Sequence, residues 1–396
     1  MDISRRVVVT GIGAVSPAGA DAESHALGLM AGWPLCEALG SGFEEFDHAI
    51  GCRVRSMEST EDGLPRHVGL GLPAVREAAE HAGLSDQDRA ETDVVAATAI
   101  SAIVELEVAY RAGVAPPAGW FGFDMLTERA RTELGSRGRS LTVSTGCTTS
   151  LDALGVAFDA VASGRSRRVL VVAAEAALTP AVVAGFQRVG ALSTRRVPPE
   201  RASCPFSGER DGFVLAEGAA ALIVEDAELA AARGARPALE FCGWASVSSA
   251  YHMTGIRKTG EDIARSIRQA LADACVSADA IDCVDAHGSS TPLNDASEAA
   301  AFGEVFGARS SSLPVVAQKG VMGHALGASN LLEVVGLAGL LPKGVLPPVK
   351  NTTSHTLNEP VDLVIDEPRH LWPEYLVKTS SGFSGLHSAC VIRVLS

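Results

Sequence analysis

Cys147 is the residue whose surroundings best suit covalent chemistry. It lies in LTVSTGCTTSLDALGVAFDAVASG, where a β-branched run ends, one glycine follows, and Leu151, Leu154 and Phe158 recur at helical spacing. This pattern places Cys147 at a helix N-terminus, where free backbone N–H groups and the helix dipole favour a thiolate and can hydrogen-bond an oxyanion. We therefore predict a nucleophile whose pKa is lowered toward neutrality. The alternative is a buried apolar cysteine.

Two further segments, DAHGSSTPLND and AQKGVMGHALGASNLLE, carry polar residues at the ends of predicted strands. His287 follows the strand IDCVDA, Lys319 ends a second strand, and His324 opens an Ala/Gly-rich helix. A thiol nucleophile needs partners that move protons and stabilise charge, and these side chains supply them. Either histidine alone fits equally well as a satisfied core or loop residue. Neither has a second ligand at three- or four-residue spacing, so we expect no metal site.

The elements that must position these residues alternate along the chain. β-branched runs at 6–10, 92–97, 140–145, 169–174 and 220–225 are separated by Ala-rich segments of helical spacing, which predicts an α/β fold. Continuous apolar runs such as VLVVAA indicate strands covered by helices on both faces. The second half repeats this element order, with a helix at 260–274 and closing strands near VDLVI, YLVKTS and ACVIRVL. We predict a duplicated βα architecture with domains at 1–235 and 236–396.

Composition excludes several classes of protein. The 396 residues include 33 basic and 47 acidic side chains, and a net charge of −14 argues against nucleic acid or an anionic membrane as partner. No apolar run has the length of a membrane span, and the first residues do not resemble a secretion signal. The eight cysteines contain no C-x-x-C pair and suggest no disulfide framework. We therefore expect a cytoplasmic protein.

These segments resemble those of the β-ketoacyl-ACP synthases, which have the thiolase fold. The similar segments run in order over nearly the whole chain: VVVTGIGAVSPAG, VSTGCTTSLDALG, CPFSGERDGFVLAEGAAALIVE, HGSSTPLND, KGVMGHALGASNLLE and SSGFSGLHSA. Within the family, VSTGCT followed by S-L-D is most similar to the α ketosynthase subunit of type II polyketide synthases. The resemblance implies a thiolase-like fold layered α-β-α-β-α.

The resemblance also implies a role for each site residue. Cys147 would accept the acyl group, His287 and His324 would serve malonyl decarboxylation, and Lys319 with Glu333 would support them. Further residues would bind the substrate or the oxyanion: Ser289, Thr291 and Phe383 at the pantetheine arm, and the backbone N–H groups of Cys147 and Ser381 in the oxyanion hole. No cofactor is expected, because the substrates are carried on the phosphopantetheine of an acyl carrier protein.

Three departures from the family pattern concern the acyl pocket. The closing turn reads SGFSG where fatty-acid members read FGFGG, so Ser381 replaces the first, gating phenylalanine and we expect the acyl chain to run past it. The segment 97–141 is shorter than the family's cap. Asn330 stands in a helix where the family has a run of small residues.

Three functions remain open at this stage. The leading one is a decarboxylating condensing enzyme; the others are an acyltransferase that releases no carbon dioxide and a non-catalytic partner subunit. The presence of Cys147, Lys319 and both histidines favours the first. As partners we expect an acyl carrier protein and a related chain-length-factor-like subunit, or otherwise a second copy, paired through the strand VLVVAAEAA. Two arginine clusters are candidates for carrier docking: Arg195, Arg196 and Arg201, which we favour, and Arg165, Arg167 and Arg168.

Overall fold

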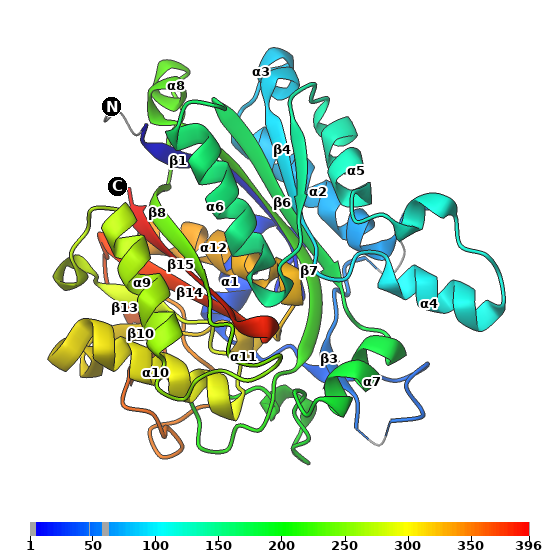
Figure 1. The fold of residues 1–396 in the computed structure, drawn as a ribbon, viewed down its shortest axis with the longest axis vertical. Coiled ribbons are helices and arrows are strands. Elements are labelled where there is room, and N and C mark those ends of the chain that lie inside the picture. The colour runs from blue at the N-terminus through cyan, green and yellow to red at the C-terminus, as the bar shows by residue number, and fades with distance from the viewer. Residues whose placement is uncertain (1–4, 47, 58–62, 396) are drawn as a thin grey trace.

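The computed structural model describes residues 5–46, 48–57 and 63–395, and most of its strands join in one large sheet with two equivalent halves (Figure 1). The strands of the first half are β1 (Val7–Val15), β4 (Asp93–Ala97), β5 (Ser140–Val143), β6 (Arg168–Ala176) and β7 (Leu215–Asp226). Those of the second half are β8 (Leu239–Ser248), β9 (Cys283–Asp285), β10 (Pro314–Val316), β14 (Tyr375–Gly382) and β15 (Leu386–Val394). The remaining strands are short: β2 (Glu37–Ala38), β3 (Ile50–Cys52), β11 (Val345–Leu346), β12 (Asp362–Leu363) and β13 (Arg369–His370).

The two halves have the same strand order. The first runs β1-β7-β6-β4-β5 and the second β8-β15-β14-β9-β10, so that each places its first, fifth, fourth, second and third strand side by side. They meet where β1 pairs with β8 in antiparallel fashion. The predicted duplication is therefore confirmed at the level of topology. Residue 235 lies between α8 (Ala227–Ala232) and β8, and the division into two domains there stays a prediction.

Helices cover both faces of the sheet halves (Figure 1). The outer layers contain α2 (Arg66–His81) and α5 (Met125–Leu134) on the first half, and α9 (Glu261–Asp273) and α10 (Pro292–Phe306) on the second. The short helix α3 (Asp86–Glu91) precedes β4 and buries none of its residues. Between the halves lie α6 (Thr149–Ala162) and α12 (Ser329–Leu340), with α1 (Ala22–Ala31) packed on α12. This is the expected α-β-α-β-α layering.

The central helices have sequences that suit burial on all sides. In α12 every residue except Gly339 is buried, and α6 buries most of its residues. A helix that is apolar all round is stable only inside a core. Because α6 and α12 begin beside each other in this middle layer, their first turns bring residues from both halves of the chain to one place.

The strand expected to pair across a subunit interface does not have a free edge. The segment VLVVAAEAA belongs to β6, which is buried throughout and pairs with β4 on one side and β7 on the other. That prediction is wrong. Of the described strands in the first half, β5 is the one at the end of the sheet, where it pairs with β4. A sheet continued into a second subunit would therefore use β5.

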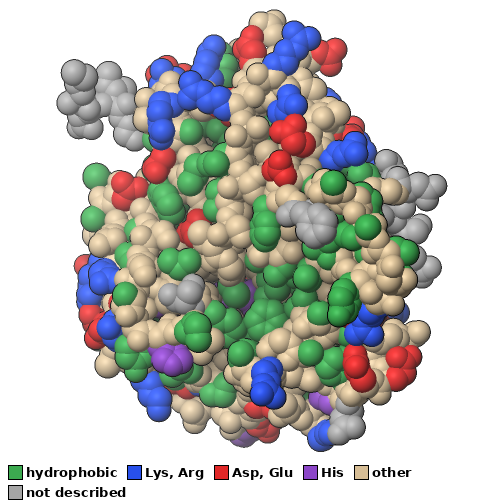
Figure 2. Space-filling view, turned by 45° about the vertical axis from the view of Figure 1, so that its right-hand side comes forward, with side chains coloured by type: hydrophobic (Ala, Val, Ile, Leu, Met, Phe, Trp, Pro, Cys, Tyr) green, Lys and Arg blue, Asp and Glu red, His purple; other side chains and the backbone are tan. Residues whose placement is uncertain are grey.

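The segment 97–141 contains α4 (Ile103–Ala112), a 3-10 turn at Ala118–Phe121 and α5. It exposes large apolar side chains, among them Val108, Tyr110 and Val114, and Leu141 of β5 is about half exposed. Figure 2 turns this side of the molecule toward the viewer. Hydrophobic side chains gather in the middle of the face that it shows. Within the described residues, no helix combines the length and hydropathy needed to cross a membrane.

Candidate active site

One cavity collects most of the residues predicted from the sequence. It is lined by Cys147, His287, Ser289, Thr291, His324, Ser381 and Phe383, together with Phe213, Ile256, Asn294 and Gly382. These residues come from both halves of the chain and from six different segments. The cavity is narrow.

Cys147 lies in a tight turn between β5 and α6. Gly146 adopts a φ of 70°, a left-handed conformation that favours glycine, and Cys147 follows in a 3-10 turn at Gly146–Thr148. The turn is tied to the helix because Thr145 and Thr148 both donate hydrogen bonds to Asp152, at 2.6 and 2.8 Å. The predicted position of Cys147 at the start of a helix is thus confirmed.

The predicted direction of the thiol pKa is wrong. Burial raises the pKa of Cys147 to about 11, and it outweighs the attraction of Lys319 and the hydrogen bond from the backbone N–H of Phe383, both of which lower the pKa. The residues that bury the thiol come largely from the second half of the chain, which the local helix argument did not include. At neutral pH the resting thiol therefore keeps its proton.

We expect alkylation of Cys147 by iodoacetamide to rise about tenfold per pH unit between pH 7 and 10, since the thiolate fraction grows by that factor below the pKa. Mass mapping of labelled peptides over this range measures the profile, and the exposed Cys275 provides an internal reference for reagent access. If the alkylation rate levels off by pH 8, the pKa of Cys147 is lowered, as predicted from the sequence, and not raised.

The two histidines face each other in the cavity. Their ring centroids are 5.2 Å apart in an edge-to-face arrangement. Burial lowers the pKa of both rings well below the usual value, and the nearby charge of Lys319 lowers each further. Both are therefore neutral at pH 7, and each ring retains one N–H that can donate a hydrogen bond. For His324, Ser329 Oγ lies 2.8 Å from Nδ1, which leaves Nε2 for the cavity.

Lys319 and Glu333 form the pair predicted from the resemblance, behind the cavity. Lys319 Nζ lies 2.5 Å from Glu333 Oε1 and donates to the backbone carbonyl of His287 at 2.8 Å. Glu333 also pairs with Lys378, whose Nζ lies 2.9 Å from Asp285. The four charges are buried and balance one another, so the network fixes the loop that carries His287 without a net buried charge.

The predicted substrate residues line the cavity. Ser289 and Thr291 line it with their hydroxyl oxygens 3.0 Å apart, and Thr291 caps the first turn of α10. The ring of Phe383 packs against Phe186, with centroids 6.1 Å apart. A phenylalanine therefore still stands beside Cys147, although Ser381 replaces the one two residues earlier.

The backbone N–H of Ser381 stays a predicted oxyanion donor. The backbone N–H groups that hydrogen-bond the sulfur and lower the pKa of Cys147 are those of Phe383 and of Cys147 itself. The side chain of Ser381 instead lies against His387, with Oγ 3.0 Å from Nδ1. The turn at Phe383–Gly385 that follows β14 brings the Phe383 amide to the nucleophile.

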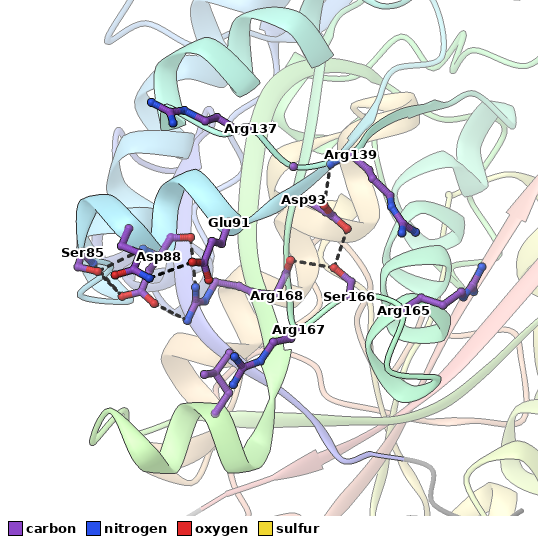
Figure 3. Close-up of a pocket in the computed structure, with 13 residues that line it drawn as sticks. Ser85, Asp88, Glu91, Asp93, Arg137, Arg139, Arg165, Ser166, Arg167 and Arg168 are labelled. Atoms are coloured by element: carbon purple, nitrogen blue, oxygen red, sulfur yellow. Dashed lines mark hydrogen bonds and ion pairs between the residues drawn. The ribbon is translucent and has the colours of Figure 1, made fainter.

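The first arginine cluster does not form one positive surface. Arg168 is buried and pairs with Glu225 and Asp88, at 3.1 and 3.0 Å. Arg165 and Arg167 lie around a groove of about 650 Å³ (Figure 3). Its other charged lining residues are Asp88, Glu91, Asp93, Arg137, Arg139 and Arg168. In Figure 3 Arg139 and Arg165 extend to one side and Arg137 and Arg168 to the other, with Asp88, Glu91 and Asp93 among them. Carrier docking at this cluster stays a prediction that we do not favour.

The second cluster lies beside the cavity. The backbone of Ser193 pairs with Phe213, which lines the cavity, and Arg195 follows two residues later. Arg195 is partly buried and pairs with Glu209 at 2.5 Å, whereas Arg196 and Arg201 are exposed. This arrangement leaves Arg196 and Arg201 as the accessible members of the cluster.

Sequence reasoning missed four residues that support the site: Asp285, Glu298, Ser329 and Lys378. Glu298 accepts hydrogen bonds from the backbone N–H groups of His287 and Gly288, both at 2.8 Å. Asp285 and Lys378 had a recognisable signal, because each is a charged residue that directly follows apolar residues of a strand. Among the described residues, no three His, Cys, Asp or Glu side chains are grouped as a metal site.

Comparison with known proteins agrees with this geometry. The N-terminal domain model of beta-ketoacyl synthases matches residues 4–230, and the C-terminal domain model matches residues 239–353. The actinorhodin polyketide putative beta-ketoacyl synthase 1 of Streptomyces coelicolor is 34% identical over 422 residues, which covers 99% of this chain and 89% of that protein. The chain therefore belongs to the beta-ketoacyl synthase family.

Other relatives point the same way. The tetracenomycin polyketide synthase ketoacyl synthase alpha subunit of Streptomyces glaucescens is 32% identical, with 98% of this chain and 97% of that protein covered. The AntDE:AntF structure, a type II polyketide synthase acyl-carrier protein in complex with its ketosynthase, matches with a TM-score of 0.91 and 33% identity over 99% of this chain and 100% of that chain. The ishigamide ketosynthase/chain length factor matches with a TM-score of 0.89 and 29% identity, covering 99% and 100%.

Proposed function

We propose that this chain catalyses decarboxylative Claisen condensation of acyl and malonyl carrier-protein thioesters. The observation that carries the proposal is the single cavity that holds Cys147, His287 and His324. In the first step the Cys147 sulfur attacks the acyl thioester carbonyl, its proton passes to the departing carrier thiol, and an acyl-enzyme remains. The backbone N–H groups of Cys147 and Phe383 are the donors we assign to the tetrahedral oxyanion.

In the second step malonyl-carrier loses carbon dioxide and becomes an enolate. The N–H groups of the neutral His287 and His324 donate to the enolate oxygen, where negative charge develops. The enolate carbon then attacks the acyl group on Cys147, which forms the carbon–carbon bond and expels the thiolate. A proton returns to the sulfur, and the β-ketoacyl-carrier leaves. Nothing in these steps requires a metal or a cofactor of the enzyme's own.

The relatives support a place in type II polyketide biosynthesis, with an acyl carrier protein and a chain-length-factor-like subunit as partners. The edge position of β5 and the exposed apolar side chains of α4 support an interface on that side. The cysteines of the described part of the chain are free, which supports a location in the reducing cytoplasm.

Incubation with malonyl-carrier separates the candidate functions. A condensing enzyme releases carbon dioxide from malonyl-carrier alone and, with acyl-carrier added, forms a β-ketoacyl-carrier. An acyltransferase loads Cys147 but releases no carbon dioxide, and a non-catalytic subunit does neither. Absence of carbon dioxide release from the purified chain together with its partner subunit would refute the proposal.

Reversal of one exposed charge tests carrier docking. We expect Arg201→Glu to raise KM for carrier-bound substrates about two- to fivefold, the effect of an exposed charge pair of about 0.5–1 kcal/mol, and to weaken the dependence of KM on salt. Arg137→Glu is the matched control, because Arg137 is exposed but lies at the groove of Figure 3 rather than beside the cavity. Equal KM values for the two variants would place docking elsewhere.

A further inference from the structure

The first turn of α12 contacts the catalytic residues of both halves. Ser329 Oγ lies 2.8 Å from His324 Nδ1, and Glu333 pairs with both buried lysines. Between them Asn330 reaches across to the other half of the chain, where its side-chain Nδ2 donates to the backbone carbonyl of Cys147 at 2.9 Å. Asn330 is fully buried, and it stands where the resembled family has a small residue.

The carbonyl of Cys147 needs such a partner. Thr148 is the N-cap of α6, so the hydrogen-bond ladder of the helix begins at the carbonyl of Thr148, one residue after Cys147. The only other side-chain donor to this carbonyl within the described residues is Ser380 Oγ, at a longer 3.3 Å. Without Asn330 this carbonyl keeps only the longer bond from Ser380, and because an unpaired buried carbonyl costs about 1–3 kcal/mol, a weakened one favours rotation of the turn toward a better partner.

We propose that Asn330 is a positioning residue that clamps the nucleophile turn and so aims the Cys147 sulfur at the amide of Phe383. The clamp acts through backbone geometry: the fixed carbonyl holds the peptide that links Cys147 to Thr148. This peptide is attached to the Cα that carries the sulfur, and the N–H of Cys147 is attached to the same Cα through the backbone nitrogen. The catalytic consequence rests on the proposed function, but the effect on thiol reactivity does not.

The test compares Asn330→Leu with the parent chain. Leucine has the same branching and number of side-chain heavy atoms as asparagine and no donor. We expect alkylation of Cys147 by iodoacetamide at pH 8 to fall about five- to tenfold, with the pH profile displaced to higher pH, because the thiolate loses a well-aimed donor. We expect kcat for acyl transfer to fall by a similar factor with little change in KM. The titratable groups that face Cys147, which are Lys319, Glu175, His287 and His324, are unchanged in this variant.

Ser150→Ala is the matched control. It removes the 3.3 Å hydrogen bond from the Leu331 N–H to Ser150 Oγ, which joins the same two helices without touching the backbone of Cys147. We expect its alkylation profile to equal that of the parent chain. If Asn330→Leu does not fold, Asn330→Ala takes its place, with thermal unfolding measured for each variant.

The outcomes separate this inference from the proposed function. A folded Asn330 variant with the parent's alkylation rate and pH profile would overturn the clamp, as would an equal loss in Ser150→Ala. If the profile shifts as expected but the parent chain releases no carbon dioxide from malonyl-carrier, the clamp stands and the proposed function fails.

Discussion

Replacement of His324 with alanine will reduce carbon dioxide release from malonyl-carrier by about a hundred- to a thousandfold, the usual cost of removing one donor aimed at developing negative charge. His324 is neutral because burial lowers its pKa well below the usual value, so its N–H can donate to the enolate oxygen. Once the His324 ring is removed, His287 cannot replace its hydrogen bond, because His287 already donates its own N–H to the enolate oxygen. Radiolabelled carbon dioxide released under single-turnover conditions is the measurement.

Two comparisons make this result specific. The pH profile of Cys147 alkylation in His324→Ala is expected to stay within about twofold of the parent's, because the charge that lowers the thiol pKa most is that of Lys319. His355→Ala is the matched control, since His355 is exposed and is not a lining residue of the cavity. Carbon dioxide release in His324→Ala within tenfold of the parent's would refute its assigned role.

Replacement of Lys378 with methionine will lower the free energy of unfolding by about 3–5 kcal/mol, the cost of breaking a buried ion pair from one side. Lys378 is fully buried between Asp285 and Glu333, and these two carboxylates raise its pKa against the effect of burial. Without it, two buried carboxylates share the single charge of Lys319. Urea unfolding at neutral pH measures the loss.

Lys343→Met provides the matched comparison for this variant. Lys343 is exposed, so we expect its replacement to change the free energy of unfolding by no more than about 0.5 kcal/mol. If Lys378→Met loses less than about 1 kcal/mol, the buried network does not stabilise the fold in the way its geometry indicates.

The sequence was sufficient to predict the features that depend on local pattern. The β-branched run, the glycine and the helical spacing after Cys147 predicted a nucleophile at a helix start, and that position is confirmed. The alternation of strands and helices predicted a duplicated architecture, and the equal strand order of the two halves confirms it. The helix start depends on neighbours in the chain, and the duplication is visible in the order of successive segments, which explains why both could be predicted.

Features that depend on distant segments could not be predicted. The thiol pKa is raised by burial in a cavity lined by residues such as Ser381, more than two hundred positions away in the chain, and the local helix argument gave the opposite direction. An apolar run such as β6 has the same sequence pattern whether its edges are free or paired, and here both are paired. Asn330 was recognised as a departure from the family, but its contact with Cys147 requires the packing of α12 against α6.

The most direct test of the account is the intact mass of the enzyme through one catalytic cycle. Incubation with acyl-carrier should add the mass of one acyl group, located at Cys147 by peptide mapping. Addition of malonyl-carrier should then remove it, with one carbon dioxide and one β-ketoacyl-carrier formed per acyl group lost. An acyl group at another residue, or one removed from Cys147 without release of carbon dioxide, would contradict the proposed condensation.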